Sequence, residues 1–208
     1  TGCMPDVIST GTILTKPGTY CVSMSFDQIL TISGNSIEVD LNNQTIAGLV
    51  IEPESRLVTI KNGTINAQQD DGILVQENAT GIVIENVTVQ NAMCGIHFNQ
   101  SPSNQVQYCT LTHNVTGLSI SESPNNIIVG TIAYSNLHAG FEVHRSSNTI
   151  FTECQALNTG LNNTVAANNR VIGFSCLGTN NIFERCIVNA SQALSTTDQE
   201  SIIAGFAL

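Results

Sequence analysis

A short pattern of apolar and polar positions recurs along most of the chain. A glycine is followed by an apolar residue, a variable residue and a second apolar residue, as in Gly95-Ile96-His97-Phe98. The copies begin at Gly48, Gly72, Gly95, Gly117, Gly140, Gly173 and Gly205. The intervals between them are 24, 23, 22, 23, 33 and 32 residues, so the repeat has one period with two insertions of about ten residues.

A second pattern runs in phase with the first. An apolar residue is followed by others three and five positions later, as in Ile84, Val87 and Val89, through seven consecutive copies. Apolar and polar residues alternate within each copy, which predicts strands with one buried face. Three short strands and their turns fill one coil of about 22 residues, and stacked coils pair equivalent strands in parallel about 4.8 Å apart. The pattern therefore predicts an all-β solenoid.

Three kinds of segment carry a family resemblance: Val39-Asp40-Leu41-Asn42-Asn43-Gln44-Thr45-Ile46, the repeated Gly-Ile-x-Phe/Val strands and the Asn-x-Ile/Val-x-x-Cys stretches. They resemble the right-handed parallel β-helix superfamily, in its pectate-lyase-like and NosD-like group with short β-helix repeats. The resemblance covers residues 29–208. The expected fold is a single-stranded right-handed parallel β-helix of about seven coils of 22–24 residues, two with insertions, after an N-terminal cap segment at 1–28. Such a fold hosts many activities and assigns none.

Asparagine is unusually common, with 23 residues against 22 formally charged ones. Two series fall near the turns of successive coils. They are Asn91, Asn114, Asn136, Asn158 and Asn189, and Asn104, Asn126, Asn148 and Asn180. Asparagine tolerates left-handed backbone conformations, and its amide both donates and accepts hydrogen bonds. We therefore expect stacked amides that link one coil to the next.

Composition and charge exclude several classes of partner. Six basic residues and a net charge of -10 disfavour nucleic acid. No apolar run approaches the roughly 20 residues of a membrane span, so this segment is not expected to insert into a membrane. Few ionisable groups, abundant polar neutral residues and seven cysteines favour a secreted or surface location.

The cysteines predict no metal site and no cofactor. They form no CxxC pair, and the sequence has no Cys/His cluster with the spacing of a zinc site. Calcium requires six to eight oxygen ligands, which the scattered acidic residues do not indicate. Cys3 and Cys21 lie in the predicted cap segment. The sequence leaves two alternatives open: a disulfide between them, or two free thiols. Cys94 stands at a turn, and the other cysteines are expected to be free thiols facing the core. These are Cys109, Cys154, Cys176 and Cys186.

The two insertions, at 159–170 and 191–201, leave the repeat at nearly the same point. We expect them to stack as a wall beside the neighbouring strands, where function often resides. The chain stops in a segment typical of the first strand of another coil. Solenoid ends need covering, so we expect further coils of a longer chain, or another copy or chain, at that end.

Ionisable side chains line up on the outward positions of successive copies. The candidates on this row are His97, Ser119 and Glu142, with His144 and Arg145 nearby. Nucleophile, base and orienting group must lie within hydrogen-bond reach. Ser119 separates His97 from Glu142 and no oxyanion donor is identifiable, so a solvated sheet face is the preferred interpretation.

Asp70 and Asp71 precede the strand that follows Gly72. Glycosidases use two carboxyl groups either about 5 Å or about 6.5–9.5 Å apart. The third aspartate and the Arg-x-Lys segment of polygalacturonase-like relatives are missing from this chain. A turn before a strand, where aspartate is favoured, is therefore the preferred interpretation.

Two functions remain open from the sequence. The first is a secreted or surface-exposed β-solenoid that acts as a rigid stalk, spike or fibre, or as an adhesive segment in contact with glycans. It rests on the regular repeat and on the incomplete active-site pattern. The second is a polysaccharide-processing enzyme, such as a lyase, glycoside hydrolase or epimerase, or its substrate-binding scaffold. It rests on the family resemblance and on the row of ionisable side chains.

Overall fold

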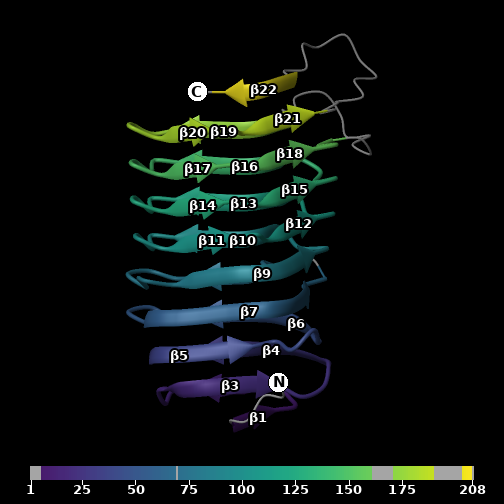
Figure 1. Ribbon diagram of the computed structural model, residues 1–208, viewed down its shortest axis with the longest axis vertical. Helices are drawn as coiled ribbons and strands as arrows, with labels where there is room; N and C mark the ends of the chain where they lie inside the picture. Colours follow the sequence, from purple (N-terminus) through teal and green to yellow (C-terminus); the bar gives the residue numbers. More distant parts are fainter. Residues whose placement is uncertain (1–5, 69, 161–170, 190–202, 208) are drawn as a thin grey trace.

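The computed structural model describes residues 6–68, 70–160, 171–189 and 203–207. In these residues the backbone forms 22 β-strands and no helix. The strands wind into coils that stack along one long axis, from the N-terminal coil to the C-terminal one (Figure 1). Their pairings are parallel and join equivalent strands of successive coils. The predicted right-handed parallel β-helix of about seven turns is confirmed.

The parallel ladders define three faces of the solenoid. Face A contains β2 (Ile13–Leu14), β4 (Phe26–Ile32), β6 (Thr45–Ile51), β8 (Ile73–Val75), β10 (Cys94–Asn99), β13 (Thr116–Ser121), β16 (Ala139–His144), β19 (Val171–Leu177) and β22 (Ile203–Ala207). Face B contains β1 (Asp6–Ile8), β3 (Gly18–Val22), β5 (Asn35–Asp40), β7 (Arg56–Asn66), β9 (Val83–Gln90), β11 (Gln105–Gln107), β14 (Ile127–Val129), β17 (Ile150–Thr152) and β20 (Ile182–Glu184). Face C contains the start of β6, the second halves of β7 and β9, and β12 (Thr110–Thr112), β15 (Ile132–Tyr134), β18 (Gln155–Leu157) and β21 (Ile187–Asn189).

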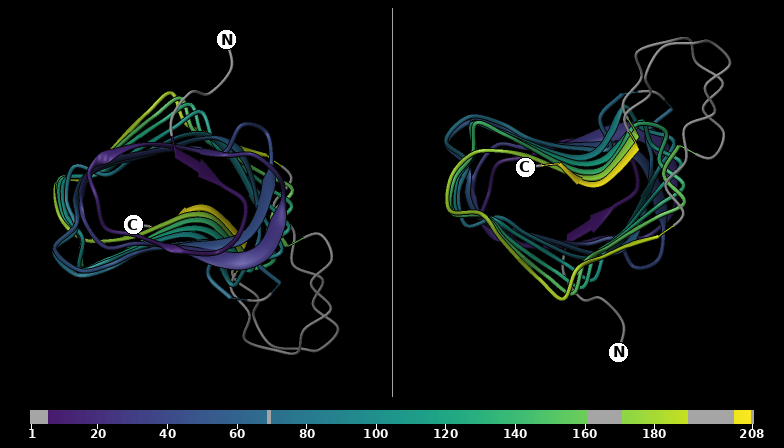
Figure 2. Two further views of the ribbon diagram at one scale, coloured as in Figure 1. Left: turned by 90° about the horizontal axis from the view of Figure 1, so that it is seen from below. Right: turned by 90° about the horizontal axis from the view of Figure 1, so that it is seen from above.

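Buried apolar side chains fill the space enclosed by the three faces. The strands of face A bend toward this core (Figure 2). Equivalent inward positions stack above one another. On face A one such column contains Ile73, Ile96, Leu118, Phe141 and Phe174, all buried. The last two rings lie parallel, with centroids 4.6 Å apart. A repeated inward position thus becomes a continuous apolar column.

The bend between faces B and C requires one left-handed residue on each coil. The residues with positive φ at this bend are Asn62, Asn86, Tyr108, Gly130, Glu153 and Arg185. Asparagine adopts this conformation more readily than most residues. The bend therefore explains part of the asparagine content without any role in binding.

One column of buried asparagines stands where face C turns into face A. Asn114 Oδ1 accepts the backbone N–H of Ala92 on the preceding coil at 2.9 Å. Asn136 Oδ1 accepts the N–H of Asn114 in the same way at 3.0 Å. Each amide also donates to the preceding coil, to the carbonyl of Val89 at 3.1 Å or of Leu111 at 2.9 Å. The asparagine amides thus hydrogen-bond the backbone N–H and C=O groups that have no strand partner at the turn.

A second column stands before face B. Asn104 Oδ1 accepts the N–H of Ile82 at 2.9 Å, and Asn126 Oδ1 accepts the N–H of Asn104 at 2.8 Å. Thr149 interrupts the column, and its buried hydroxyl has no hydrogen-bond partner in the described part of the chain. Asn181 resumes the column by accepting the N–H of Thr149 at 2.9 Å.

Five asparagines of the predicted series do not join these columns. Asn91, Asn148, Asn158 and Asn180 have positive φ and lie one residue before the column positions. Asn189 pairs with Leu157 inside face C. Two of these asparagines still link coils as expected, because the amide of Asn91 donates to Asn66 Oδ1 at 2.9 Å and that of Asn148 to Asn125 Oδ1 at 3.2 Å. Each predicted series thus mixes a left-handed turn position with the adjacent buried amide position, and both positions favour asparagine.

The first coils begin earlier than the repeat suggested. β1 pairs with β3, β2 with β4 and β3 with β5, all in parallel. Part of the predicted cap at 1–28 therefore belongs to the same ladders as the repeats. These strands lack the glycine signature, but backbone pairing does not require it.

Four of the cysteines are the predicted free thiols in the core: Cys109, Cys154 and Cys176 are buried, and Cys186 is half-buried. Cys21 is disulfide-bonded. Cys3 lies outside the described residues, so its pairing with Cys21 remains a prediction. The greater part of both insertions also lies outside the described residues, and so does the predicted wall.

Asn126→Ala should lower the free energy of unfolding by about 1–3 kcal/mol, because the buried N–H of Asn104 loses its acceptor. The amide of Asn126 also donates to the carbonyl of Ser123 at 2.7 Å. Denaturant unfolding measures the change. Asn99→Ala, at an exposed position of β10, is the matched control and should stay within about 0.5 kcal/mol of wild type. Equal losses in the two variants would contradict the structural role of the column.

The stacked thiols Cys154 and Cys186 should titrate differently. A hydrogen bond with Cys154 lowers the pKa of Cys186, so its reactive thiolate forms at a lower pH than that of an ordinary thiol. The rate of alkylation by iodoacetamide, followed by mass spectrometry, should rise with pH and level off at a lower pH than for an ordinary thiol. In Cys154→Ala the midpoint should move up toward the ordinary thiol value of about 8.5. Buried Cys109, whose pKa burial raises to about 12, should stay unlabelled in the folded chain. An unchanged midpoint would refute the coupling.

Candidate functional site

The edge at which the chain passes from face C to face A gathers the candidate groups. We call it the C–A corner, and in the described chain it comprises residues 67–68, 70–72, 91–93, 113–115 and 135–138. It begins next to Asp71 and continues past Cys94 to the start of β16. The candidate site therefore lies along one edge of the solenoid rather than on one coil.

The register of face A places Asp71 directly beside Cys94. Leu74 pairs with His97 in the ladder between β8 and β10, and the same offset relates Asp71 to Cys94 on the next coil. A glycine follows each of these two residues, because the backbones approach too closely for a side chain. A Cβ on Gly72 would lie 2.6 Å from the carbonyl oxygen of Gly95. Backbone pairing thus fixes the Asp71 and Cys94 positions.

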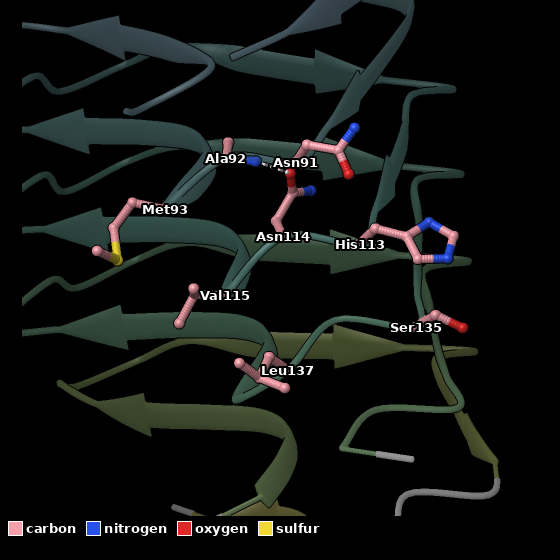
Figure 3. A pocket seen from close by; sticks show the side chains of 8 residues that line it. All are labelled: Asn91, Ala92, Met93, His113, Asn114, Val115, Ser135 and Leu137. Atoms are coloured by element: carbon pink, nitrogen blue, oxygen red, sulfur yellow. Dashed lines mark hydrogen bonds between the residues drawn. The ribbon is translucent and has the colours of Figure 1, made fainter. Parts of the chain in front are cut away.

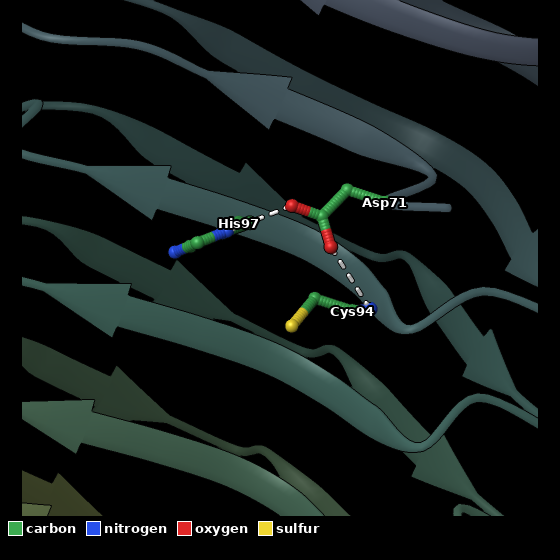
Figure 4. A group of neighbouring side chains, drawn as sticks. All are labelled: Asp71, Cys94 and His97. Carbon is green, nitrogen blue, oxygen red and sulfur yellow. Dashed lines mark hydrogen bonds and ion pairs between the residues drawn. The ribbon is translucent and has the colours of Figure 1, made fainter. Parts of the chain in front are cut away.

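The Asp71 carboxylate joins both neighbours on β10 (Figure 4). Its Oδ2 lies 2.8 Å from Nδ1 of His97, and its Oδ1 accepts the backbone N–H of Cys94 at 3.2 Å. The side chains of His97 and Asp71 are 23% and 22% exposed, so solvent reaches the pair. One ligand-type atom of each of the three residues lies within 4.8 Å of the others. These three residues form what we call the Asp–Cys–His cluster.

The cluster perturbs its own acid–base groups. Burial favours a higher pKa for Asp71, but the hydrogen bond and charge of His97, with the N–H of Cys94, bring that pKa below its usual value. Burial raises the pKa of the Cys94 thiol to about 12, and the charges of Asp71 and Glu142 act in the same direction. A nucleophilic cysteine needs the opposite shift. The cluster therefore does not resemble an activated thiol.

The predicted row on face A exists as an aligned ladder. His97 pairs with Ser119, and Ser119 pairs with Glu142 on the next coil. No hydrogen bond joins these three side chains in the described part of the chain, and Ser119 is buried. The structure therefore brings His97 to Asp71 rather than to Ser119 and Glu142.

Among the described residues, the side chains of the remaining candidates predicted from the sequence form no hydrogen bond with Asp71 or His97. His144 lies on a parallel row, opposite Ser121 and Leu177. Arg145 forms an exposed ion pair with Glu122 at 3.5 Å. Asp70 stays at the corner, where its carbonyl accepts the N–H of Met93 at 2.9 Å. Asp70 and Asp71 thus take part in a turn, and Asp71 also binds His97.

Two hollows lie along the C–A corner, on the coils next to the cluster. The larger, of about 480 Å³, is lined by an apolar column, Met93, Val115 and Leu137, and by polar groups that include His113 and Ser135 (Figure 3). The smaller, of about 380 Å³, is lined by Asp27, Ile29, Ala47, Gly48, Ala67, Gln68, Asp70 and Asp71. Since Met93 precedes Cys94 and Asp71 lines the smaller hollow, the two hollows and the cluster follow one line.

The cluster supplies two kinds of chemistry. A carboxylate bound to Nδ1 of a histidine fixes the ring and leaves Nε2 for proton transfer, as in hydrolytic triads. The same three side chains also offer oxygen, sulfur and nitrogen donors to a metal ion. Cys94 is not among the site residues predicted from the sequence. The signal that finds it is Cys94-x-x-His97 together with the 23-residue offset to Asp71.

Stacked parallel ladders, a three-faced core and coil-to-coil side-chain columns define a parallel β-helix. The family model described as "Right handed beta helix region" matches residues 20–173, and the chain belongs to that family. No curated protein matches the chain. In the described residues, no helical segment has the length and apolar character needed to cross a bilayer.

Several solved structures share this fold at low sequence identity. The periplasmic alginate epimerase AlgG is 16% identical with a TM-score of 0.63, and the match covers 92% of this chain and 50% of the epimerase. Pectate lyase Pel9A is 18% identical with a TM-score of 0.52, covering 84% of this chain and 53% of the lyase. The enzymatically active domain of bacteriophage CBA120 tailspike protein 2 is 12% identical with a TM-score of 0.51, covering 95% and 38%. The chain thus spans about half or less of each structure, and the likeness shows the fold.

Proposed function

We propose that this chain is a rigid, adhesive β-helix segment that binds a neutral polysaccharide along the C–A corner, outside the cytoplasm. The observation that carries the proposal is the succession of two hollows along this corner, one lined by Asp71 of the Asp–Cys–His cluster and the other by Met93, which precedes Cys94. From β4 to β16 the line crosses five coil-to-coil steps, about 24 Å at 4.8 Å per step. An extended polymer suits such a line better than a small molecule.

The lining of the larger hollow supports a sugar ligand. Met93, Val115 and Leu137 offer an apolar surface, while His113 and Ser135 offer hydrogen-bonding groups beside it. Sugar rings have apolar C–H faces and polar hydroxyl edges, which match these two columns. Ligand sites commonly combine an apolar lining with a few placed polar groups.

Charge favours a neutral glycan over an acidic one. The smaller hollow contains Asp27, Asp70 and Asp71, and Glu142 lies on the adjacent face. Four of the five Lys and Arg residues in the described chain pair with glutamates, namely Arg56, Lys61, Arg145 and Arg185. The fifth, Lys16, lies between β2 and β3 and lines neither hollow. A polyanion such as alginate or pectate would face these carboxylates without a basic partner. We therefore propose a neutral ligand for this chain, although the similar enzymes are named for the acidic polysaccharides alginate and pectate.

The location is supported by chemistry and by likeness. Cys21 is disulfide-bonded, and disulfides persist in oxidising compartments. The alginate epimerase is periplasmic, and the tailspike belongs to a phage. Buried amide columns and stacked aromatic rings give the rigidity that a spike or adhesive segment needs.

Binding to a panel of neutral and acidic polysaccharides, by affinity electrophoresis and calorimetry, tests the proposal. We expect a neutral polymer to bind. His113→Ala with Ser135→Ala, which removes two polar groups of the larger hollow, should weaken binding about 5- to 150-fold, since two lost hydrogen bonds cost about 1–3 kcal/mol together. Gln105→Ala with Gln107→Ala, which alters the outward side of face B, is the matched control. Binding to none of the polymers, or equal losses in both double variants, would refute the site.

A second function is favoured by one specific observation. The 2.8 Å contact between Asp71 and Nδ1 of His97 makes Nε2 a positioned base for a polysaccharide lyase, hydrolase or epimerase. The carboxylate would stabilise the imidazolium formed when Nε2 takes a proton. Face A would hold the sugar against this base.

Turnover by the purified chain tests this second function. Reducing-end release, unsaturated products and sugar inversion should be followed with neutral and acidic polymers. If His97 is the base, His97→Ala should lower turnover about 10²–10⁴-fold while the folded chain keeps its thermal stability. The face B double variant should retain full turnover. Absence of turnover would leave the adhesive function alone, and turnover that survives His97→Ala would refute His97 as the base.

A further inference from the structure

We infer that Asp71, Cys94 and His97 form a binding site for one divalent transition-metal ion of the zinc or cobalt type. The three side chains come from two adjacent coils and converge on one point of the C–A corner (Figure 4). The inference is independent of the polysaccharide proposal, because it concerns the ion and these ligands alone.

Geometry is the first support. A carboxylate oxygen, a thiol sulfur and an imidazole nitrogen lie within 4.8 Å of one another. Zinc bonds of about 2.0–2.3 Å in tetrahedral arrangement place ligand atoms roughly 3.3–3.8 Å apart. An ion between the present positions therefore needs side-chain shifts of about 1 Å or less. It would replace the hydrogen bond between Asp71 and His97.

The scaffold is the second support. The pairing of β8 with β10 fixes Asp71 against Cys94, and the hydrogen bonds Gly72 N–H to Cys94 O and Met93 N–H to Asp70 O lie on either side. Cys94 and His97 are three residues apart on one strand. Ligands held by backbone pairing lose little freedom on binding.

Local charge is the third support. Asp70 and Asp71 line the adjoining hollow, and Glu142 lies near enough to act on Cys94 electrostatically. Each Lys or Arg ion pair in the described residues is made with a glutamate and involves neither aspartate. His97 is the ion-pair partner of Asp71. A divalent cation would balance this negative region.

Ligand type selects the ion. Thiolate and imidazole favour zinc-like or cobalt-like ions, whereas calcium and magnesium require oxygen ligands. Three protein ligands leave a fourth tetrahedral position for water. The site would thus be of the open kind, exposed to the corner.

Cobalt(II) titration of the chelator-treated full chain, with its disulfide intact and no polysaccharide present, tests the inference. We expect one cobalt per chain with a thiolate-to-cobalt absorption band, displaced by zinc(II) and unaffected by excess calcium. Cys94→Ser should abolish the band, and His97→Ala and Asp71→Asn should each weaken binding at least about tenfold. Cys186→Ser, which removes a half-buried thiol elsewhere, should bind cobalt like wild type.

The wild-type chain provides a check that does not depend on the folding of any variant. Zinc(II), but not calcium, should raise the Tm of the wild-type chain in a concentration-dependent way, because an ion that binds only the folded chain stabilises it. Absence of the band, its persistence in Cys94→Ser, or an unchanged Tm in zinc would overturn the site. Such a failure would leave the polysaccharide proposal standing, because that proposal is measured by glycan binding.

Discussion

Parallel hydrogen bonding between equivalent residues of successive coils is the interaction on which this molecule depends. It sets one rise of about 4.8 Å per coil and brings each side chain over its own equivalent. A residue type at one repeat position must therefore pack or hydrogen-bond well against the same type on the next coil. Phenylalanine stacks on phenylalanine, and Asn136 accepts the N–H of Asn114. Glycine stands where a Cβ on Gly117 would lie 2.4 Å from the carbonyl oxygen of Gly140.

The candidate site is a consequence of the same constraint. Because Asp71 and Cys94 occupy one repeat position on adjacent coils, an acid and a thiol that lie 23 residues apart become neighbours. His97 then completes the cluster from the same strand as Cys94. The two hollows follow the corner for the same reason, since each coil turns there above the one before. A site on a solenoid is thus read along the stack rather than along the chain.

Much of the fold follows from the repeat, and less of the site does. The glycine pattern predicted face A, and the inward triplets such as Ile84, Val87 and Val89 predicted the other two faces. The asparagine columns were predicted with an error of one residue at several coils, because a turn and a buried amide both favour asparagine. The row of His97, Ser119 and Glu142 was predicted in its alignment, yet its members do not contact one another. The contact of His97 with Asp71 was missed because paired aspartates before a strand are typical of a turn.

The sequence by itself determined the class of architecture, since periodicity and alternation depend only on the order of residue types. It also determined the scarcity of charge and the net charge of -10, which disfavour nucleic acid as a partner. Only the tertiary structure decided which ionisable groups meet. The reason is physical: a one-residue difference in register or in turn conformation moves a side chain to another column, and the periodicity alone does not resolve that difference. The contact of Asp71 with the strand that carries Cys94 and His97 is such a case. It depends on the backbone hydrogen bonds of Asp70 and Gly72 with the next coil and on the pairing of β8 with β10.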